Sequence, residues 1–147
     1  LIGIGNRLRG DDGIGYRLAE TLAAKRRVTA TPLQALAVQQ LTPDLAAVVA
    51  SADAVLFADA WLQGEPELAP IRLAEQASPQ QPSPLSHQLS PAQLLALSEQ
   101  LYGHQPTAWL LPLPARQLNH GDSLSPTAAQ ALVAALQLLC HWRPNDA

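Results

Sequence analysis

The sequence predicts the α/β class: a single domain with a mostly parallel, twisted sheet of about five strands and helices on both faces. Two observations support this class. Short apolar runs alternate along the chain with longer segments of helical periodicity, and the run at 54–58 is apolar throughout, as in a central parallel strand buried on both faces. The 147 residues suit one domain with a sizeable core, so we expect residues 1–147 to form one domain.

The N-terminal half of the chain predicts three strands that alternate with two helices. The chain begins inside the first strand, so we expect a few residues of that strand to be missing. Thr at alternate positions favours the second strand, and Pro at the first turn favours the start of the second helix. The predicted elements are a strand at 1–5, a helix from Gly13 with Ile14, Leu18 and Leu22 facing the core, a strand at Val28–Leu33, a helix at 44–50 and a strand at 54–58.

The C-terminal half predicts two further strands and two further helices. A weak strand that contains Pro suits a sheet edge, and a stretch rich in Pro, Ser and Gln suits a loop. The predicted elements are an edge strand at Pro70–Leu73, a loop at 75–86, a helix at Pro91–Tyr102 with Leu94, Leu95, Leu97 and Leu101 facing inward, a strand at 108–113, and a long helix that begins after Ser125 and ends near His141.

Composition and charge argue against two classes of partner. The formal net charge of -3 gives no basic surface for nucleic acid, and no apolar run approaches the roughly 20 residues that span a membrane. Cys140 is the only cysteine, so an internal disulfide is excluded and nothing in the sequence requires secretion. We therefore expect a cytoplasmic protein.

Residues 3–15, GIGNRLRGDDGIG, combine several glycines with two adjacent acids, Asp11 and Asp12. The dinucleotide-binding pattern Gly-x-Gly-x-x-Gly fails in both frames, because its third position is Leu8 in one and Leu18 in the other. Both carboxylates would also repel a phosphate at the N-terminus of the following helix. Nucleotide binding is therefore disfavoured. Two interpretations stay open: the acids are helix caps, or they contribute to a cation site.

A third acid, Asp59, follows the predicted central strand. An acid in that position is costly unless it is capped, paired or bound to a cation. It is expected at the same carboxyl end of the sheet as Asp12, where two close carboxylates favour a proton or a cation between them. An imidazole would add selectivity for a transition metal, and on chemistry alone His87 and His120 are equal candidates. Either histidine could equally be an ordinary surface residue.

Four segments together resemble a known family. They are GIGNRLRGDDGIG (3–15), VLFADA (55–60), SHQLSPAQLLAL (86–97) and GDSLSPTA (121–128). In order and spacing they resemble the maturation endopeptidases of [NiFe] hydrogenases, over nearly the whole chain. Two more segments, QQLTPDLA (39–46) and ALSEQLYG (96–103), are most similar to the branch that serves bidirectional, NAD-linked hydrogenases, found in cyanobacteria among others.

The resemblance implies a cation site of Asp12, Asp59 and His87, and it favours His87 over His120. Many relatives have Glu where this chain has Asp12. The resemblance also implies an aspartyl-type endopeptidase with Asp12 and Asp59 as catalytic residues. Such an enzyme recognises nickel already inserted in the hydrogenase large-subunit precursor and removes a C-terminal peptide from it. The nickel comes with the substrate, and no organic cofactor is expected.

Substrate recognition is expected from residues at the same end of the sheet, namely Asn6, Gln39, Gln40 and Leu41. The sequence leaves the role of the metal open: it could polarise the scissile carbonyl or activate water, or it could serve only for recognition while an Asp acts as base. No Ser lies in a nucleophile-elbow motif, and Cys140 lies in the final helix, so a serine or cysteine protease is disfavoured. The alternative function is a non-catalytic, metal-responsive binding domain with the same ligands.

Overall fold

The structure is a computed structural model that describes residues 1–25, 32–64, 66–73 and 89–144. It contains a five-stranded sheet in the order β2-β1-β3-β5-β4. All neighbouring strands are parallel except β4 and β5, which are antiparallel. The predicted α/β class with a mostly parallel sheet is therefore confirmed. The elements are β1 (Ile2–Ile4), η1 (Gly10–Gly13, a 3-10 helix), α1 (Ile14–Ala24), β2 (Leu36–Val38), α2 (Leu45–Ala50), β3 (Ala54–Trp61), β4 (Ile71–Arg72), α3 (Pro91–Tyr102), β5 (Thr107–Pro114) and α4 (Pro126–His141).

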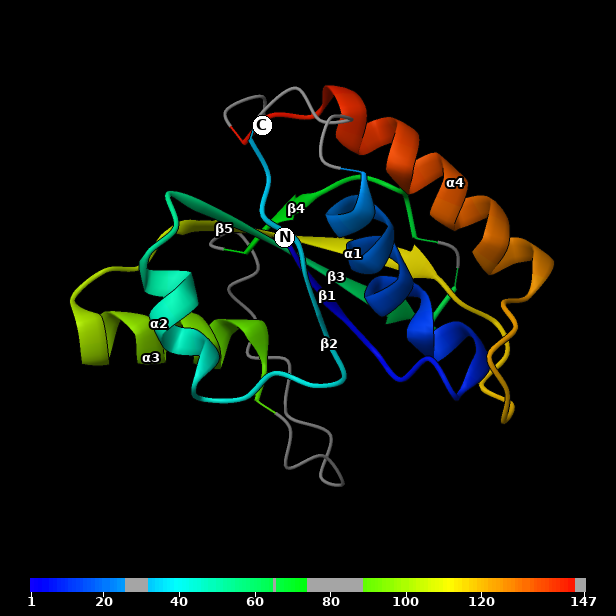
Figure 1. Cartoon of the computed structure of the whole chain (residues 1–147), viewed down its shortest axis with the longest axis horizontal. Helices are drawn as coiled ribbons and strands as arrows, with labels where there is room; N and C mark the ends of the chain where they lie inside the picture. The colour runs from blue at the N-terminus through cyan, green and yellow to red at the C-terminus, as the bar shows by residue number, and fades with distance from the viewer. Residues whose placement is uncertain (26–31, 65, 74–88, 145–147) are drawn as a thin grey trace.

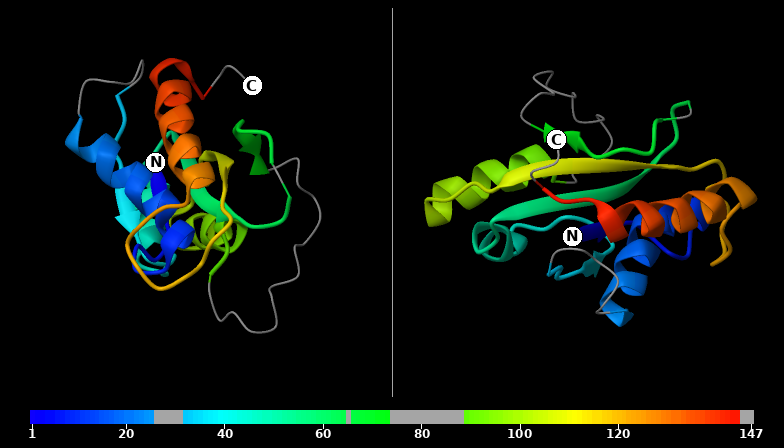
Figure 2. Two further views of the ribbon diagram at one scale, coloured as in Figure 1. Left: turned by 90° about the vertical axis from the view of Figure 1, so that its right-hand side faces the viewer. Right: turned by 90° about the horizontal axis from the view of Figure 1, so that it is seen from above.

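Helices cover both faces of the sheet, as the sequence predicts. Figure 1 shows α1 and α4 on one side of the strands and α2 and α3 on the other, and Figure 2 shows the same layers from two further directions. One core cluster joins α1 and α4 to the sheet, and a second joins α2 and α3 to the opposite face. The two clusters divide the side chains of β3 between them: Leu56 and Ala58 belong to the first, and Val55 and Phe57 to the second. This alternation places β3 at the centre of the fold.

Local signals set the bounds of α3 and α4. The Ser90 hydroxyl accepts a hydrogen bond from the Gln93 backbone N–H, and the Gln93 side chain accepts one from the Ser90 N–H, which completes a capping box. Gly103, with φ +71°, ends α3 in the left-handed conformation that glycine adopts most readily. Ser125 caps α4 by accepting from the Ala128 N–H, and Pro126 occupies the first turn.

Two predictions about secondary structure and packing are wrong. The second strand is Leu36–Val38 rather than Val28–Leu33: residues 26–31 lie outside the described residues, and Pro32 and Leu33 are not in a strand. Pairing with β1, which joins Ile2 to Leu36, decides this position, and the alternation of Thr does not. Leu101 is 59% exposed rather than core-facing. Ser98 is buried in α3 instead, with its hydroxyl bonded to the carbonyls of Leu95 and His104.

The other described elements agree with the sequence in type and order, but the central strand is longer than predicted. The strand near residue 71 lies at the sheet edge and the helices at 91–102 and 126–141 have the expected bounds. The strand expected at 54–58 extends to Trp61, so Asp59 lies inside β3 rather than after it. The expected loop at 75–86 lies outside the described residues. Among the described helices, none combines the length and apolarity that a membrane crossing needs.

Candidate active site

Asp12 and Asp59 lie at the carboxyl end of the sheet. Strands β1 and β3 are parallel neighbours, and their register pairs Gly3 with Ala58. Asp59 is therefore one residue beyond that pair, and Asp12 lies in η1, which the chain enters after leaving β1. The pairing of these strands thus places two acids that are distant in sequence at the same end of the sheet.

The Asp12 carboxylate is held by the turn that follows β1. Its Oδ2 accepts a hydrogen bond from the Asn6 backbone N–H at 2.9 Å. The Asn6 side chain stabilises the same turn, because its Oδ1 accepts from the Leu8 N–H at 3.0 Å. The first residues after β1 thus orient one oxygen of Asp12, and Asn6 shapes the site from within the loop.

The Asp59 carboxyl group favours a neutral form or a bound cation. Burial raises its pKa to about 7; the hydrogen bond from the Ala60 N–H lowers it in part, and the charge of Asp12 raises it further. This influence agrees with the packing of η1 against β3, which places both acids at the same end of the sheet. A proton or a divalent cation placed between them would relieve their repulsion. The pair therefore fits a cation-binding or acid–base role.

Asp11 differs from its neighbour Asp12 in burial and in hydrogen-bond partners. It is 0% exposed and accepts hydrogen bonds from the N–H groups of Arg116, Gln117 and Ser125, at 2.7 to 3.0 Å, and from the Ser125 hydroxyl at 2.6 Å. Burial by itself would raise the pKa of Asp11, but the hydrogen bonds from Ser125, Arg116 and Gln117 outweigh it and lower this pKa. The expectation that Asp11 or Asp12 caps α1 is wrong: Gly13 occupies the cap position, with no side-chain hydrogen bond.

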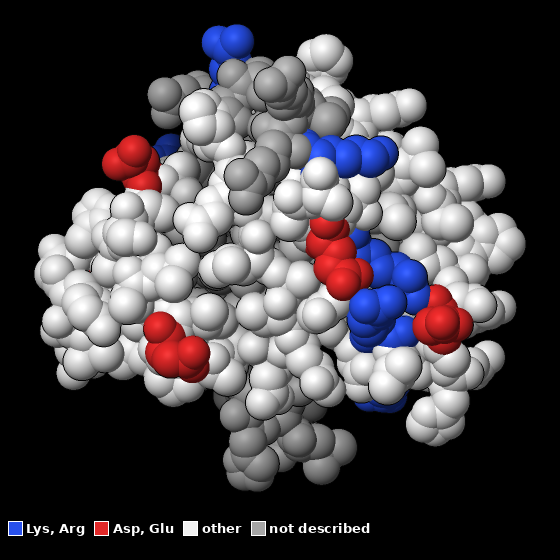
Figure 3. All heavy atoms as spheres, viewed as in Figure 1, with Lys and Arg blue, Asp and Glu red and all other residues white. Residues whose placement is uncertain are grey.

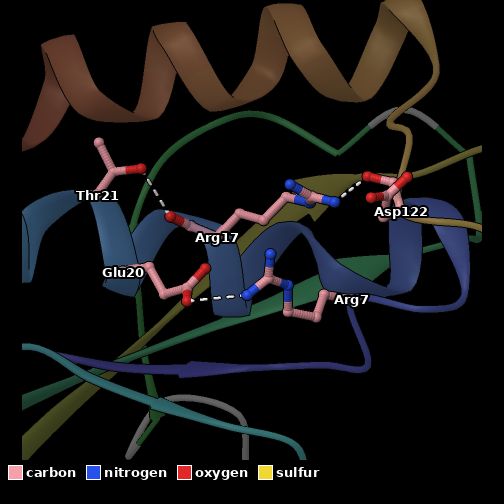
Figure 4. Close-up of polar contacts among 5 residues, drawn as sticks. All are labelled: Arg7, Arg17, Glu20, Thr21 and Asp122. Atoms are coloured by element: carbon pink, nitrogen blue, oxygen red, sulfur yellow. Dashed lines mark hydrogen bonds and ion pairs between the residues drawn. The ribbon is translucent and has the colours of Figure 1, made fainter.

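Residues 115–125, which connect β5 to α4 and are called here the 115–125 loop, lie against the turn after β1. Backbone hydrogen bonds join Gly10 to Gly121, Gly121 to Leu8, and Asp11 to Gln117. Arg17 of α1 also donates to the Asp122 backbone carbonyl (Figure 4). The loops that follow β1 and β5 thus form one connected structure beside the two carboxylates.

The glycines of residues 3–15 allow this close packing. A Cβ on Gly5 would lie 1.9 Å from the Asp12 carbonyl oxygen, and a Cβ on Gly15 would lie 2.4 Å from the Ala58 carbonyl oxygen. Glycine is therefore required where η1 and α1 approach the ends of β1 and β3. These contacts explain the glycine-rich pattern without a phosphate, in agreement with the failed dinucleotide pattern.

Charged side chains near α1 form a separate, exposed group. On the face shown in Figure 3 most of the surface is uncharged, and acidic and basic side chains gather mainly over the region of α1. Arg7 and Glu20 form an ion pair at 3.2 Å, with side chains 48% and 42% exposed; Figure 4 shows it beside Arg17. An exposed pair of this kind contributes about 0 to 1 kcal/mol to stability.

The remaining predicted residues divide into exposed, buried and undescribed ones. Gln39 and Gln40 follow β2 and are exposed, at the carboxyl end of the sheet. Leu41 is only 5% exposed and packs in the core with α2 and α3. His87 lies outside the described residues. Within the described ranges, no group of three His, Cys, Asp or Glu side chains is arranged to hold a metal ion.

A cavity of about 340 Å³ lies at the opposite, amino end of the sheet. Its lining includes Leu1, Asp53 and Trp142, and neither Asp12 nor Asp59 contributes to it. The lining is predominantly apolar and contains none of the predicted site residues. The acidic pair is therefore the better candidate for chemistry.

The fold and the site define an α/β protein with paired carboxylates at the carboxyl end of its sheet. No protein-family model matches the sequence, and no curated protein matches it significantly. Solved structures do share the fold. The [NiFe] hydrogenase maturation protease HycI from Thermococcus kodakarensis has a TM-score of 0.69 at 21% identity, covering 95% of this chain and 87% of that one.

Two further solved structures are similar. The hydrogenase maturating endopeptidase HybD from E. coli has a TM-score of 0.66 at 23% identity, covering 92% of this chain and 85% of that one. The [NiFe] hydrogenase maturation protease HybD from Thermococcus kodakarensis has a TM-score of 0.63 at 19% identity, covering 93% of each chain. The chain thus has the fold of these maturation proteases over nearly its whole length.

Proposed function

We propose that this protein is an endopeptidase that matures [NiFe] hydrogenase, removing the C-terminal extension of the large-subunit precursor after nickel insertion. The observation that carries the proposal is the pairing of Asp12 with Asp59 at the carboxyl end of a sheet whose fold is that of hydrogenase maturation proteases. The segments that resemble this family in sequence are also those that build the site, since GIGNRLRGDDGIG contains Asp12 and VLFADA contains Asp59.

In this proposal the nickel ion is part of the substrate. The Asp12 and Asp59 carboxylates supply oxygen ligands, and His87 supplies an imidazole nitrogen, a donor set that suits a divalent transition metal. The raised pKa of Asp59 supports this role, because a cation replaces the proton that burial and Asp12 otherwise favour. Precursor that carries nickel would thus be distinguished from precursor that does not.

The reaction is the hydrolysis of one peptide bond. Water adds across the bond, so that the large subunit gains a new C-terminal carboxylate and the released peptide gains a new amino group. In this proposal one carboxylate of the pair accepts a proton from the attacking water, as in aspartyl-type chemistry. We propose the cytoplasm as the site of action and the bidirectional, NAD-linked hydrogenases as the substrate branch, because of the segments at 39–46 and 96–103.

Intact mass measurement of the precursor tests this function. The purified protein is incubated with large-subunit precursor that contains nickel, and in parallel with precursor that lacks it. We expect loss of a C-terminal peptide from the nickel-containing sample only. Binding of the nickel-containing precursor with no change of mass would instead favour the alternative, a metal-responsive binding domain. Equal cleavage of both samples would contradict the role of nickel.

A further inference from the structure

The two adjacent acids of η1 point in different directions. Successive residues of a 3-10 helix are about 120° apart around its axis. Asp11 points into the protein toward the 115–125 loop, whereas the Asp12 carboxylate is directed to the Asn6 N–H in the turn after β1. Since they share a peptide bond, fixing the side chain of Asp11 limits the directions that the side chain of Asp12 can take.

The contacts of Asp11 join segments that are far apart in sequence. Its four hydrogen bonds come from residues 105 to 114 positions later in the chain. They reach both ends of the 115–125 loop, namely Arg116 and Gln117 just after β5, and Ser125 at the start of α4. Asp11 thereby ties the turn after β1 to the loop after β5, on either side of the strand that holds Asp59.

We propose that Asp11 is a positioning residue that holds η1 so that the Asp12 carboxylate stays beside Asp59. This inference rests on the proposed function, because it assigns Asp11 a part in the same cleavage reaction. Asp11 itself touches neither substrate nor metal: it is fully buried and both of its oxygens are occupied by protein donors. It affects the reaction by fixing the position of the Asp12 carboxylate.

Only a carboxylate meets all the donors that surround Asp11. Its Oδ2 accepts from two backbone N–H groups and from the Ser125 hydroxyl, and its Oδ1 accepts from the Ser125 N–H. Asn at this position would turn an NH2 group toward at least one of these donors, which leaves a buried N–H without an acceptor. Asp11→Asn keeps the size of the side chain and therefore tests the hydrogen bonds rather than the packing.

The experiment measures kcat and KM for precursor cleavage with wild type, Asp11→Asn and Asp53→Asn. Asp53 is an exposed acid at the opposite end of the sheet and serves as the matched control. Assays are run well below the unfolding temperature, and circular dichroism establishes that each protein is folded. We expect Asp11→Asn to lower kcat by about 10- to 100-fold with KM changed by less than about twofold, since small misplacements of catalytic groups have effects of this size. The Asp53→Asn protein should match the wild type.

A purely structural role for Asp11 would lower the unfolding temperature and leave kcat of the folded protein unchanged, and that result overturns the inference. A rise in KM with unchanged kcat also overturns it. If Asp11→Asn does not fold, Ser125→Gly decides, because it removes the hydroxyl's hydrogen bond to Asp11 while glycine is still tolerated as the cap of α4: a lower kcat supports the inference and an unchanged kcat contradicts it. Absence of cleavage by the wild type contradicts the proposed function itself, and this inference with it.

Discussion

Asp59 lies at the same carboxyl end of the sheet as Asp12, and burial together with the Asp12 charge raises the pKa of Asp59 to about 7. The relationship is produced by the pairing of β1 with β3, which brings together two residues 47 positions apart (59 minus 12). Near neutral pH, Asp59 can release its proton when a cation binds to the pair of carboxylates. This property links the electrostatics of the free protein to its proposed function.

The pH dependence of stability provides the first prediction. The unfolded pKa of Asp is about 3.9, so between that value and about 7 the folded protein holds a proton on Asp59 that the unfolded chain releases. The stabilisation is complete below the unfolded pKa and is lost as the pH rises through the folded pKa. We expect the free energy of unfolding of the metal-free protein to fall by roughly 2 to 3 kcal/mol between about pH 5 and pH 8 from this group.

Urea denaturation at several pH values measures this effect. In Asp59→Asn the contribution of the group is absent, so its stability should depend less on pH over this interval. Asp53→Asn, which alters an exposed acid away from the site, should keep the wild-type dependence. Identical pH profiles for Asp59→Asn and wild type would contradict the assigned pKa.

The second prediction concerns the three proposed cation ligands. Asp12→Asn, Asp59→Asn and His87→Ala should each lower cleavage of nickel-containing precursor by at least about 100-fold, because each removes a metal ligand or a catalytic carboxylate. The precursor mass after incubation gives the cleaved fraction. His120→Ala is the matched control for His87→Ala. Wild-type cleavage by Asp59→Asn would refute the proposed site. Loss of cleavage in His120→Ala but not in His87→Ala would identify His120 as the imidazole ligand.

The third prediction concerns the close approach of α1 to the sheet. In Gly15→Ala the new Cβ would lie 2.4 Å from the Ala58 carbonyl oxygen and 2.5 Å from the Ile4 carbonyl oxygen. Both are backbone atoms, so α1 must move, and we expect a loss of about 2 to 3 kcal/mol of stability. Gly64→Ala is the control: no atom of the described residues lies within 4 Å of its Cβ, and its φ of +74° costs only about 1 kcal/mol. Equal losses in urea denaturation would contradict the packing argument.

The fourth prediction concerns substrate recognition after β2. Gln39 and Gln40 are exposed at the carboxyl end of the sheet, whereas Leu41 is buried, so we assign the proposed recognition to the two glutamines. The double variant Gln39→Ala/Gln40→Ala should raise KM for the precursor by about threefold or more, with unchanged thermal stability. Gln100→Ala, an exposed residue of α3, should leave KM unaltered. An unchanged KM in the double variant would show that this segment does not contact the partner.

Much of the fold could be predicted because burial leaves a periodic pattern in the sequence. The apolar run at 54–58 predicted the central strand, and the spacing of Ile14, Leu18 and Leu22 predicted the buried side of α1. Prediction failed where the position of a residue depends on packing or pairing with a distant part of the chain, because the local apolar pattern carries no information about that contact. Leu101 has the spacing of a core residue but lies at the exposed end of α3. The position of β2 depends on its pairing with β1.

The sequence by itself determined the fold class, the order of strands and helices, and the arrival of Asp12 and Asp59 at one end of the sheet, because each of these follows from short-range periodicity and from the rule that parallel strands end on the same side. Only the tertiary structure showed that Asp11 is a buried acceptor bound by the loop after β5, whereas Asp12 accepts from the Asn6 N–H. The two acids are adjacent and chemically identical, and the donors that distinguish them lie 105 to 114 residues away. The direction of a loop side chain is set by such distant partners, whose positions are fixed only when the sheet has formed.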